Sequence, residues 1–524
     1  MDNVNDDGAN NIEHFIDIGI ALTTEKNHHA LLEKILKNAM KLSAADAGTI
    51  YSINEKQQLS FDTVLNNSLN IHLGGTSNNP INFPNIDIFT FGEANTSALV
   101  AIAAANSEII NVENVDECEN YDFSAAKIMD EHIGYRTDSV LTIPMKNHQG
   151  ELNGVIQLIN ATNENNEVIA FSSEVVRVVQ SLTSFAAIIL TNKQLVIEME
   201  NLFSSFSKLI ASAIDRKSPY TGSHCRKVPV ITMMLAKACD QKSDGPLADF
   251  SMTTEDFNQL SVAAWLHDCG KVATPEYIMD KAKKLETIFD RIELVNARFE
   301  IAARDITYSS KLSDTEKIDL LKELSSDREF INKANTGGEF FDDDKITRVY
   351  QIAKRHKVSI DGKTQSVLTD NEILNLITKR GTLTAKERQI INDHMKVTVE
   401  MLESMPFPKH LQKVPEYACG HHEKMDGTGY PKGLKRDEMS IPARIMAIAD
   451  IFEALTANDR PYKEPKTLSE TLKIMGFMKL DDHIDPDLFD VFIQEEVYLS
   501  FAENFLDKSQ IDNVDVNNIP GYLK

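Results

Sequence analysis

The sequence is poor in several kinds of residue, and each shortage excludes a class of protein. Its 524 residues include only five cysteines, and no two of them form a CxxC pair. An odd, scattered set of cysteines indicates reduced thiols and argues against a disulfide framework. Basic residues number 54 against 79 acidic ones, which gives a net charge of −25. Such a surface repels nucleic-acid backbones and anionic membranes, so we expect neither as a partner.

Long hydrophobic runs are lacking as well. The longest, ALVAIAAA at 98–105, is far shorter than the roughly 20 residues that cross a bilayer. The first residues, MDNVNDDGANN, have neither the basic start nor the apolar run of a signal peptide. We therefore expect a cytoplasmic protein. Apolar residues make up 42 % of the chain, enough to build cores, and the length favours two or three domains.

The pattern of apolar residues predicts a multidomain chain whose first half is α+β. After a disordered tail at 1–12, residues 13–180 combine a helical stretch at 13–40 with several strand-like runs separated by turn residues. The segment NHQGELNG at 147–154 predicts a tight turn between the last two strands, and hence an antiparallel sheet. The strand-like runs lie at 48–53, 138–144 and 154–160.

The second half, residues 216–510, has a helical pattern almost throughout and predicts an all-α domain. Within it, residues 283–380 are highly charged and have few turn signals before NTGGEFFDDDK. We interpret this stretch as an inserted helical hairpin with a polar tip. Residues 511–524 remain as a C-terminal tail.

A long helix joins the two halves. Residues 172–215 contain neither glycine nor proline, and apolar residues recur there in alternating steps of three and four. This spacing predicts a dimeric coiled coil over 181–215, in which a buried asparagine fixes the register. The alternative is an amphipathic helix that packs on its own domain. The predicted seam consists of Leu182, Phe185, Ile189, Asn192, Val196, Met199, Phe203, Phe206, Ile210 and Ala213.

Histidines with acidic neighbours recur in the second half. Imidazole and carboxylate together suit first-row transition metals. Seven such ligands are too many for one ion, so two neighbouring metals, able to hold a phosphodiester and activate a hydroxide, are the natural interpretation. Each histidine taken alone is equally compatible with a core or surface role. The set comprises His224, His267, Asp268, His394, the adjacent pair His421 and His422, and Asp450 in an otherwise apolar helical run.

Two residues beside the His-Asp pair add to this interpretation. Gly270 permits close approach of a backbone or a ligand. Lys271 lies three residues after Asp268, on the same helix face, where it can meet a phosphate.

The segment HDCGK, followed downstream by HHEKMDGTGYP, resembles the HD-GYP family of metal-dependent phosphohydrolases. The signature HHExxDGxGYP is matched at every fixed position, and the resemblance covers roughly residues 200–510 apart from the insertion. GTLTAKERQIINDH and DRPYKEP are similar to family segments too. The resemblance implies an all-helical domain that hydrolyses cyclic di-GMP, a bacterial second messenger, to linear pGpG or to GMP.

The resemblance also implies the roles of the candidate ligands. His224, His267, Asp268 and Asp450 would hold one metal, and Asp268 would bridge to a second metal held by His394, His421 and His422. The implied metals are iron or manganese. Asp268 and Lys271 are the expected catalytic residues, with Lys271 also a candidate proton donor to the leaving oxygen.

Substrate contacts follow from the phosphates and the turn. Lys271, Arg460 and Lys463 are the basic groups expected to meet the two phosphates, although the last two also fit a solvated turn. Asp426, Gly427 and Tyr430 are expected to line the turn that the substrate approaches. Glu423 and Asp426 are candidates for orienting the histidines, or for solvent-facing acids.

One departure bears on the number of metals. Some family members carry ETGxH where this chain has YTGSH, so Tyr220 replaces a glutamate that supports a third metal. We therefore expect two metals. Two alternatives to cyclic di-GMP hydrolysis stay open: hydrolysis of a mixed cyclic GMP-AMP, and a cyclic di-GMP receptor with weak turnover.

The first half resembles a GAF domain across residues 108–160, including GYRTDSVL and GVIQLIN. GAF domains are often sensors of small molecules and dimerisation modules. Asp130 and Glu131 match part of a cyclic-nucleotide signature, but its Asn-Lys is absent. The alternatives are a small-molecule ligand, a cyclic nucleotide among them, or a GAF domain that only dimerises. We expect a homodimer in which the GAF domain regulates the enzyme through the coiled coil.

Overall fold

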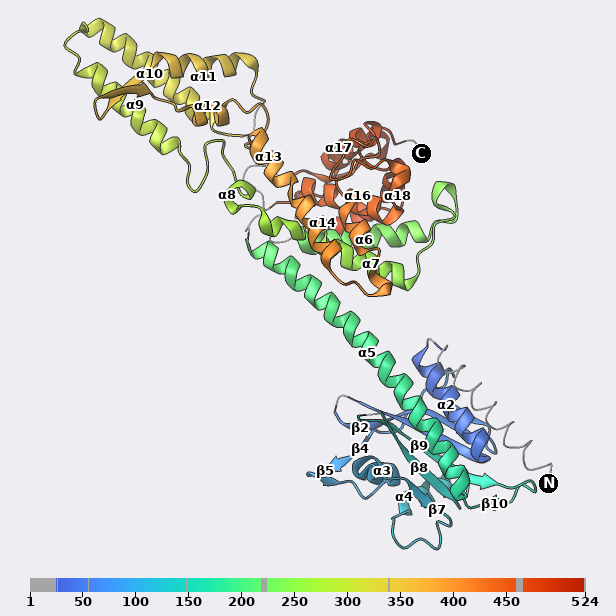
Figure 1. Cartoon of the computed structure of the whole chain (residues 1–524). Coiled ribbons are helices and arrows are strands. Elements are labelled where there is room, and N and C mark those ends of the chain that lie inside the picture. Colours follow the sequence, from blue (N-terminus) through green and yellow to red (C-terminus); the bar gives the residue numbers. More distant parts are fainter. Residues whose placement is uncertain are drawn as a thin grey trace. The chain divides into compact units, whose positions relative to one another are not determined.

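The computed structural model describes residues 25–522 apart from 26, 55, 148, 218–223, 338–339 and 459–464. Tyr220, Arg460, Lys463 and the expected tail at 1–12 therefore lie outside the described residues. The chain divides into two compact units, Met1–Asn201 and Leu202–Lys524 (Figure 1).

An antiparallel sheet forms the centre of the first unit, with the strand order β3-β2-β1-β9-β8-β7. The predicted hairpin is present, because Met145 pairs with Gly154 where β8 turns into β9. Two short strands extend the sheet, β4 beside β2 and β10 beside β9, while β5 and β6 pair separately. The strands are β1 (Ala45–Ile53), β2 (Gln58–Asn66), β3 (Ile71–Gly74), β4 (Ile86–Asp87), β5 (Phe89–Thr90), β6 (Glu93–Ala94), β7 (Ile110–Val112), β8 (Val140–Lys146), β9 (Leu152–Thr162) and β10 (Val168–Ile169).

Both faces of this sheet are covered, because successive residues of a strand point to opposite sides. Ile156 and Leu158 of β9 pack in a core with α2 (His28–Ser43) and the start of α5 (Ser173–Lys217). Val155, the residue before Ile156, belongs to the core beneath α3 on the other face (Figure 1). The helices of that second face are α3 (Leu99–Asn106) and α4 (Ser124–Ile133).

Helix α5 is the long helix that the sequence predicts, 45 residues without a break. The coiled-coil seam, however, was predicted wrongly at several positions. Leu182 and Ile189 are buried in the core of the first unit, and Phe203 and Ile210 pack against the core of the second. The alternative interpretation, a helix packed on its own domain, is therefore correct for these residues.

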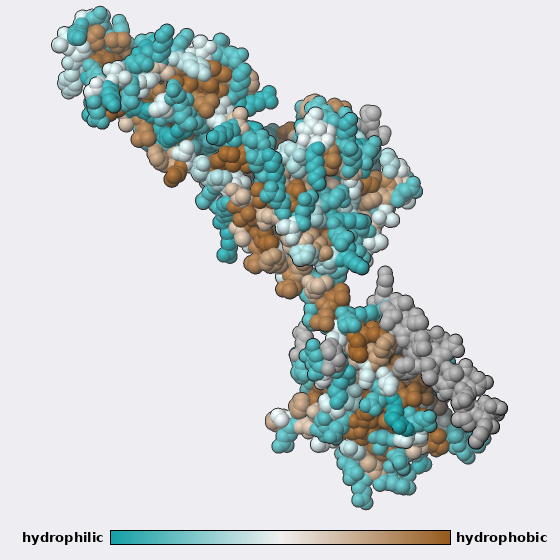
Figure 2. All heavy atoms as spheres, in the orientation of Figure 1, coloured by the Kyte–Doolittle hydropathy of each residue, from teal (hydrophilic) through white to brown (hydrophobic). Residues whose placement is uncertain are grey.

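A second row of α5 residues faces outward. It shares Asn192, Met199, Phe206 and Ala213 with the predicted seam, and each of its other four members lies one residue before a predicted seam residue. Its apolar members are exposed, Leu202 by 71 % and Leu209 by 64 %, and the stretch of α5 that links the two units along the chain has hydrophobic surface in Figure 2. The spacing again alternates between four and three. The outward row is Ile188, Asn192, Leu195, Met199, Leu202, Phe206, Leu209 and Ala213.

Helix α5 is also the one helix among the described residues that is long and apolar enough to cross a membrane, judged by length and composition. Of its most apolar 18-residue window, 39 % is buried inside the protein. A helix that contributes to a core passes the same criterion, so this is weak evidence for a membrane span.

The second unit packs its helices around one large core. Helix α16 is its centre, with apolar residues on nearly all sides. Ile519 and Tyr522, from the expected C-terminal tail, are buried in the same core. The helices are α6 (His224–Asp240), α7 (Thr254–Leu266), α8 (Glu276–Met279), α13 (Ala385–Asn392), α14 (His394–Ser404), α15 (Val414–Cys419), α16 (Ile441–Thr456), α17 (Leu468–Leu480), α18 (Pro486–Gln494) and α19 (Val497–Phe505).

The segment expected as an inserted helical hairpin has a core of its own. Besides helices, it contains an antiparallel strand pair, β11 with β12. The fully buried Lys284 donates hydrogen bonds to two carbonyl oxygens, those of Leu376 and Thr378, and so ties the start of the segment to its end. Its elements are α9 (Ile292–Thr307), α10 (Asp314–Ala334), α11 (Asp343–Arg355), β11 (Lys357–Ile360), β12 (Lys363–Ser366) and α12 (Asp370–Leu376).

Candidate metal centre

The His-Asp pair sits where α7 ends. His267 caps the C-terminus of α7, and Asp268 precedes the short 3-10 helix η2 (Cys269–Ala273). Both side chains are almost completely buried. A carboxylate in this position is costly unless charges or hydrogen bonds compensate it.

Gly270 lets η2 lie directly against α14. A Cβ atom on this residue would stand 2.0 Å from the carbonyl oxygen of His394, and the Gly270 N–H donates to Thr398 Oγ1 at 3.0 Å. This contact brings Asp268 Oδ1 within 3.2 Å of His394 Nε2. The close approach that the sequence predicts for this glycine is therefore confirmed, and its partner is a backbone.

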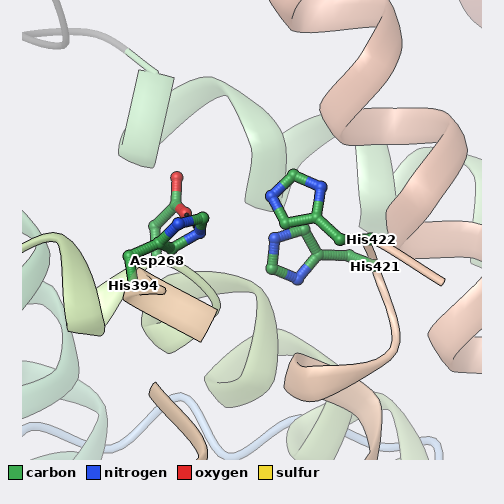
Figure 3. A group of neighbouring side chains, drawn as sticks. All are labelled: Asp268, His394, His421 and His422. Carbon is green, nitrogen blue, oxygen red and sulfur yellow. Dashed lines mark ion pairs between the residues drawn. The ribbon is translucent and has the colours of Figure 1, made fainter. Parts of the chain in front are cut away.

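The seven candidate ligands gather in two groups that share Asp268. In the first, His224 Nε2 lies 3.1 Å from Asp268 Oδ2 and 3.2 Å from Asp450 Oδ1, and His267 Nε2 lies 3.2 Å from Asp268 Oδ2. In each group the candidate ligand atoms lie within 4.8 Å of one another. Figure 3 shows the side chains of the second group pointing toward one another. The groups are His224, His267, Asp268 and Asp450, and Asp268, His394, His421 and His422.

Three of these histidines are oriented in the same way. The Nδ1 atoms of His267, His394 and His421 lie 2.7, 2.5 and 2.6 Å from the carbonyl oxygen three residues earlier in the chain. Each Nδ1–H therefore donates to backbone, and each Nε2 points inward. Within the described part of the chain these buried Nε2 atoms, like Asp268 Oδ1, have no hydrogen-bond partner. Buried nitrogen and oxygen atoms that lack a hydrogen-bond partner and point toward one another are suited to act as metal ligands.

His224 is held differently, and by a residue that the sequence reasoning missed. Its Nδ1 lies 2.5 Å from Glu453 Oε2, and Glu453 is fully buried. Glu453 follows Asp450 by three residues on α16, so both carboxylates lie on one helix face. A second acid in the apolar run IMAIADIFEAL was the signal that could have identified it.

The electrostatics of the site favour an ionised Asp268 and neutral imidazoles at His421 and His422, whereas the surrounding carboxylates raise the pKa of His224 despite its burial. Burial alone would raise the pKa of Asp268, but the charge of Lys271 holds that pKa well below its ordinary value. Burial lowers the pKa of His421 far below its usual range and that of His422 to about 4. Metal ions bind deprotonated ligands, so the pKa shifts of Asp268, His421 and His422 suit coordination.

Lys271 and Tyr430 lie at the edge of the two groups. Lys271 Nζ is 2.5 Å from Asp268 Oδ2, and the Tyr430 ring stacks on the His422 imidazole with centroids 4.9 Å apart. Of the residues expected to contact the substrate, Lys271 and Tyr430 therefore lie beside the ligand groups. Arg460 and Lys463, the other two expected phosphate contacts, lie outside the described residues.

The turn after the histidine pair is stabilised from within. The buried Glu423 carboxylate accepts hydrogen bonds from three consecutive backbone N–H groups, those of residues 432 to 434, at 2.7 to 3.2 Å. Asp426 accepts from the N–H of Thr428 at 2.8 Å. Gly427 has a φ of 84°, a conformation that favours glycine. Glu423 and Asp426 thus hold the loop, and within the described ranges their carboxylates bond to loop groups and not to the ligand histidines.

Comparison with known families finds one matching domain model in each unit. Residues 27–190 match the GAF domain model, and residues 369–488 match an HD domain model. The chain therefore carries a GAF domain and an HD domain, as the resemblances predict. The HD match contains His394, His421, His422 and Asp450, whereas the other three candidate ligands precede it.

Curated relatives share part of this chain. A probable cyclic di-GMP phosphodiesterase of Vibrio cholerae is 36 % identical over 140 residues, which are 26 % of this chain and 31 % of the relative. A 3'3'-cGAMP-specific phosphodiesterase of the same organism is 38 % identical over 139 residues, with the same coverage of 26 % and 31 %. A cyclic di-GMP phosphodiesterase of Thermotoga maritima is 41 % identical over 98 residues, covering 19 % and 26 %. The chain thus spans less than a third of the length of these relatives.

We expect Gly270→Ala to destabilise the HD domain, because the new methyl group would overlap a backbone oxygen that cannot easily move. Overpacking of this kind costs about 1–3 kcal/mol, which corresponds to a fall of several degrees in Tm. Thermal unfolding followed by calorimetry measures it. Val272→Ala in the same short helix, at a side chain that is 53 % exposed, should leave Tm nearly unchanged. Equal Tm values for wild type and Gly270→Ala would contradict the proposed close contact.

Proposed function

We propose that the HD domain is a two-metal phosphodiesterase acting on a cyclic dinucleotide. The observation that carries this proposal is the buried carboxylate of Asp268, which is shared by two ligand groups. The three buried Nε2 atoms without hydrogen-bond partners add to it. The names of the relatives supply the substrate class, since cyclic di-GMP and 3'3'-cGAMP phosphodiesterases are among them.

Each group of side chains would hold one metal, with Asp268 as the bridge. The bound pair would supply a hydroxide at neutral pH and stabilise charge on the phosphoryl oxygens. The histidine-rich ligand set suits iron or manganese. We expect two metals per chain, because Tyr220 stands where some family members have a glutamate that supports a third metal.

The remaining residues position the substrate. Lys271, beside Asp268 at the edge of the site, presents a cation to a phosphate and is a candidate donor to the leaving oxygen. Tyr430 extends the ring surface of His422 on which a base can stack. Asp426 and Gly427 shape the loop that the substrate approaches, and we assign Arg460 and Lys463 to the second phosphate.

Cyclic di-GMP is the proposed substrate, with pGpG, GMP or both as products. The alternative substrate is mixed cyclic GMP-AMP, which the name of a relative with 38 % identity favours. A receptor with weak turnover is the less favoured alternative, because every expected ligand side chain is present and correctly grouped.

The direct test incubates anaerobically purified protein with cyclic di-GMP and, separately, with 3'3'-cGAMP while metal content is measured. Wild type should contain two metals per chain and linearise at least one of the two dinucleotides. His394→Ala should retain one metal, because His394 belongs to one group only, whereas Asp268→Asn should lose both. Activity should fall by several orders of magnitude in both variants. If the wild type contains two metals and hydrolyses neither dinucleotide, the proposed phosphodiesterase activity is refuted.

Glu453→Gln tests the proposed support of His224. The amide keeps the shape of the side chain but removes the charge that orients the imidazole, and losses of such groups typically lower metal affinity about 10- to 100-fold. Titration with a competing chelator measures the affinity. The exposed Glu503 on α19 provides the control, since Glu503→Gln removes the same charge at a residue that belongs to neither ligand group. If Glu453→Gln binds metal with unchanged affinity, Glu453 does not support His224 in metal binding.

The protein as a whole is proposed to be a cytoplasmic homodimer in which the GAF domain regulates hydrolysis. The outward row of α5 supports the dimer, because exposed apolar residues at heptad spacing form a coiled-coil seam with an identical helix. Asn192 in that row occupies the kind of core position at which asparagine favours two parallel strands. Leu182 and Ile189, buried elsewhere, take no part in this seam.

The double change Leu195→Lys and Leu202→Lys should convert the dimer to a monomer. Both side chains are exposed in the single chain, so the substitutions leave each domain's own core intact. Sedimentation equilibrium measures the mass. Ile197→Lys, at an exposed isoleucine on the opposite side of the helix, should remain dimeric. A dimer that survives the double change, or that Ile197→Lys disrupts equally, would exclude this seam.

A further inference from the structure

A cavity of about 490 Å³ lies on the α3 and α4 face of the GAF sheet, in the first unit, whereas the candidate metal centre belongs to the second. Its floor is made by residues of β1, β2, β8 and β9, among them Tyr51, Phe61 and Gln157. Leu99 at the start of α3 and Phe123 just before α4 form part of its wall. The volume is typical of small-molecule sites.

Aromatic side chains form one side of this cavity. Tyr51 and Phe61 have ring centroids 4.7 Å apart, and Phe61 and Phe83 are 5.2 Å apart, both pairs being tilted. Phe83 stands at the rim with 37 % of its surface exposed. The three rings thus form a continuous row in space, on which a flat molecule can pack.

Polar groups along the cavity are few. Besides the Tyr51 hydroxyl, the polar side chains of the described lining are Ser97, Asp122, Thr137 and Gln157. The Thr137 hydroxyl already donates to Asp130 at 3.2 Å. The side-chain amide of Gln157 rises from the floor and makes one long hydrogen bond, 3.3 Å to Thr142 Oγ1. Gln157 is therefore the group best placed to fix the orientation of a ligand.

Charge in the cavity argues against a nucleotide. Among the described lining residues the one charged side chain is that of Asp122, and its pKa is lowered by the backbone N–H of Ser124, so it carries a negative charge. A phosphate beside it would be repelled, with no lysine, arginine or histidine of the described lining to compensate. Asp130, the partial match to a cyclic-nucleotide signature, accepts from the N–H of Thr137 at 2.8 Å and stabilises its own loop.

We infer that this cavity binds an uncharged molecule with an aromatic or other flat apolar ring, packed on Tyr51, Phe61 and Phe83 and hydrogen-bonded to Gln157. The proposal concerns a site separate from the metal centre, and its test is independent of whether the HD domain hydrolyses a cyclic dinucleotide.

The test measures binding of N-phenyl-1-naphthylamine, an uncharged aryl amine that fluoresces in apolar surroundings, to the full-length protein. Cyclic GMP and cyclic AMP in large excess serve as competitors. Wild type should bind one probe molecule per chain, and neither nucleotide should displace it. Displacement by either nucleotide would overturn the proposal.

Two variants and one control locate the bound probe. Ala126→Trp fills the cavity from α4 and should weaken binding about tenfold or more. Phe83→Ala removes a rim aromatic with little effect on the fold and should weaken binding about threefold or more. The control is Phe91→Ala, at a fully exposed aromatic outside the cavity, which should bind as wild type does. Circular dichroism establishes that each variant is folded, and Phe83→Ala decides the outcome where Ala126→Trp is not. Wild-type affinity in the folded cavity variants, or loss of binding in Phe91→Ala, would place the probe elsewhere and refute the site.

Discussion

The buried carboxylate of Asp268 is the constraint on which the HD domain depends. An ionised carboxylate without partners in a protein interior costs several kcal/mol. Lys271 at 2.5 Å and His224 at 3.1 Å offset this cost, and His267 and His394 lie 3.2 Å from the same carboxylate. These four neighbours come from α6, the continuous stretch in which α7 runs into η2, and α14, so three segments that are separate along the chain must meet at one side chain. The same convergence that compensates the charge also creates the two ligand groups.

Helix ends explain how so many imidazoles point inward at once. The last carbonyl groups of a helix have no intrahelical partner. His267 and His421 each follow the end of a helix, and their Nδ1 atoms lie beside carbonyl oxygens of that last turn. The hydrogen bond satisfies a helix terminus and fixes an imidazole ring in one step. Backbone that forms the fold is thus the same backbone that orients the candidate ligands.

Much of this could be predicted from the sequence, and the exceptions have physical causes. All seven candidate ligands were identifiable because motif spacing and residue type are local properties. Glu453 was missed because its role appears only when α6 places His224 against α16. The coiled-coil register was wrong because two apolar rows of α5 lie one residue apart, and heptad spacing does not show which row is covered by the helix's own domains. The function of Gly270 was anticipated, but its backbone partner in α14 required the fold.

Strand β9 connects the cavity of the GAF domain to the helix that leaves it. Gln157 and Ile159 line the cavity, while Ile156 and Leu158, on the opposite face, share a core with the beginning of α5. Asn153 of the same strand donates to Thr191 Oγ1 of α5 at 2.7 Å. A ligand that shifted the floor of the cavity would therefore act through a single strand on residues in contact with α5, because a close-packed interior transmits strain. Helix α5 then continues without glycine or proline into the core of the HD domain, where Ala211 and Ile214 are buried. Helix α5 is therefore a continuous element with residues buried in the core of each domain, and a displacement at one end can be transmitted to the other.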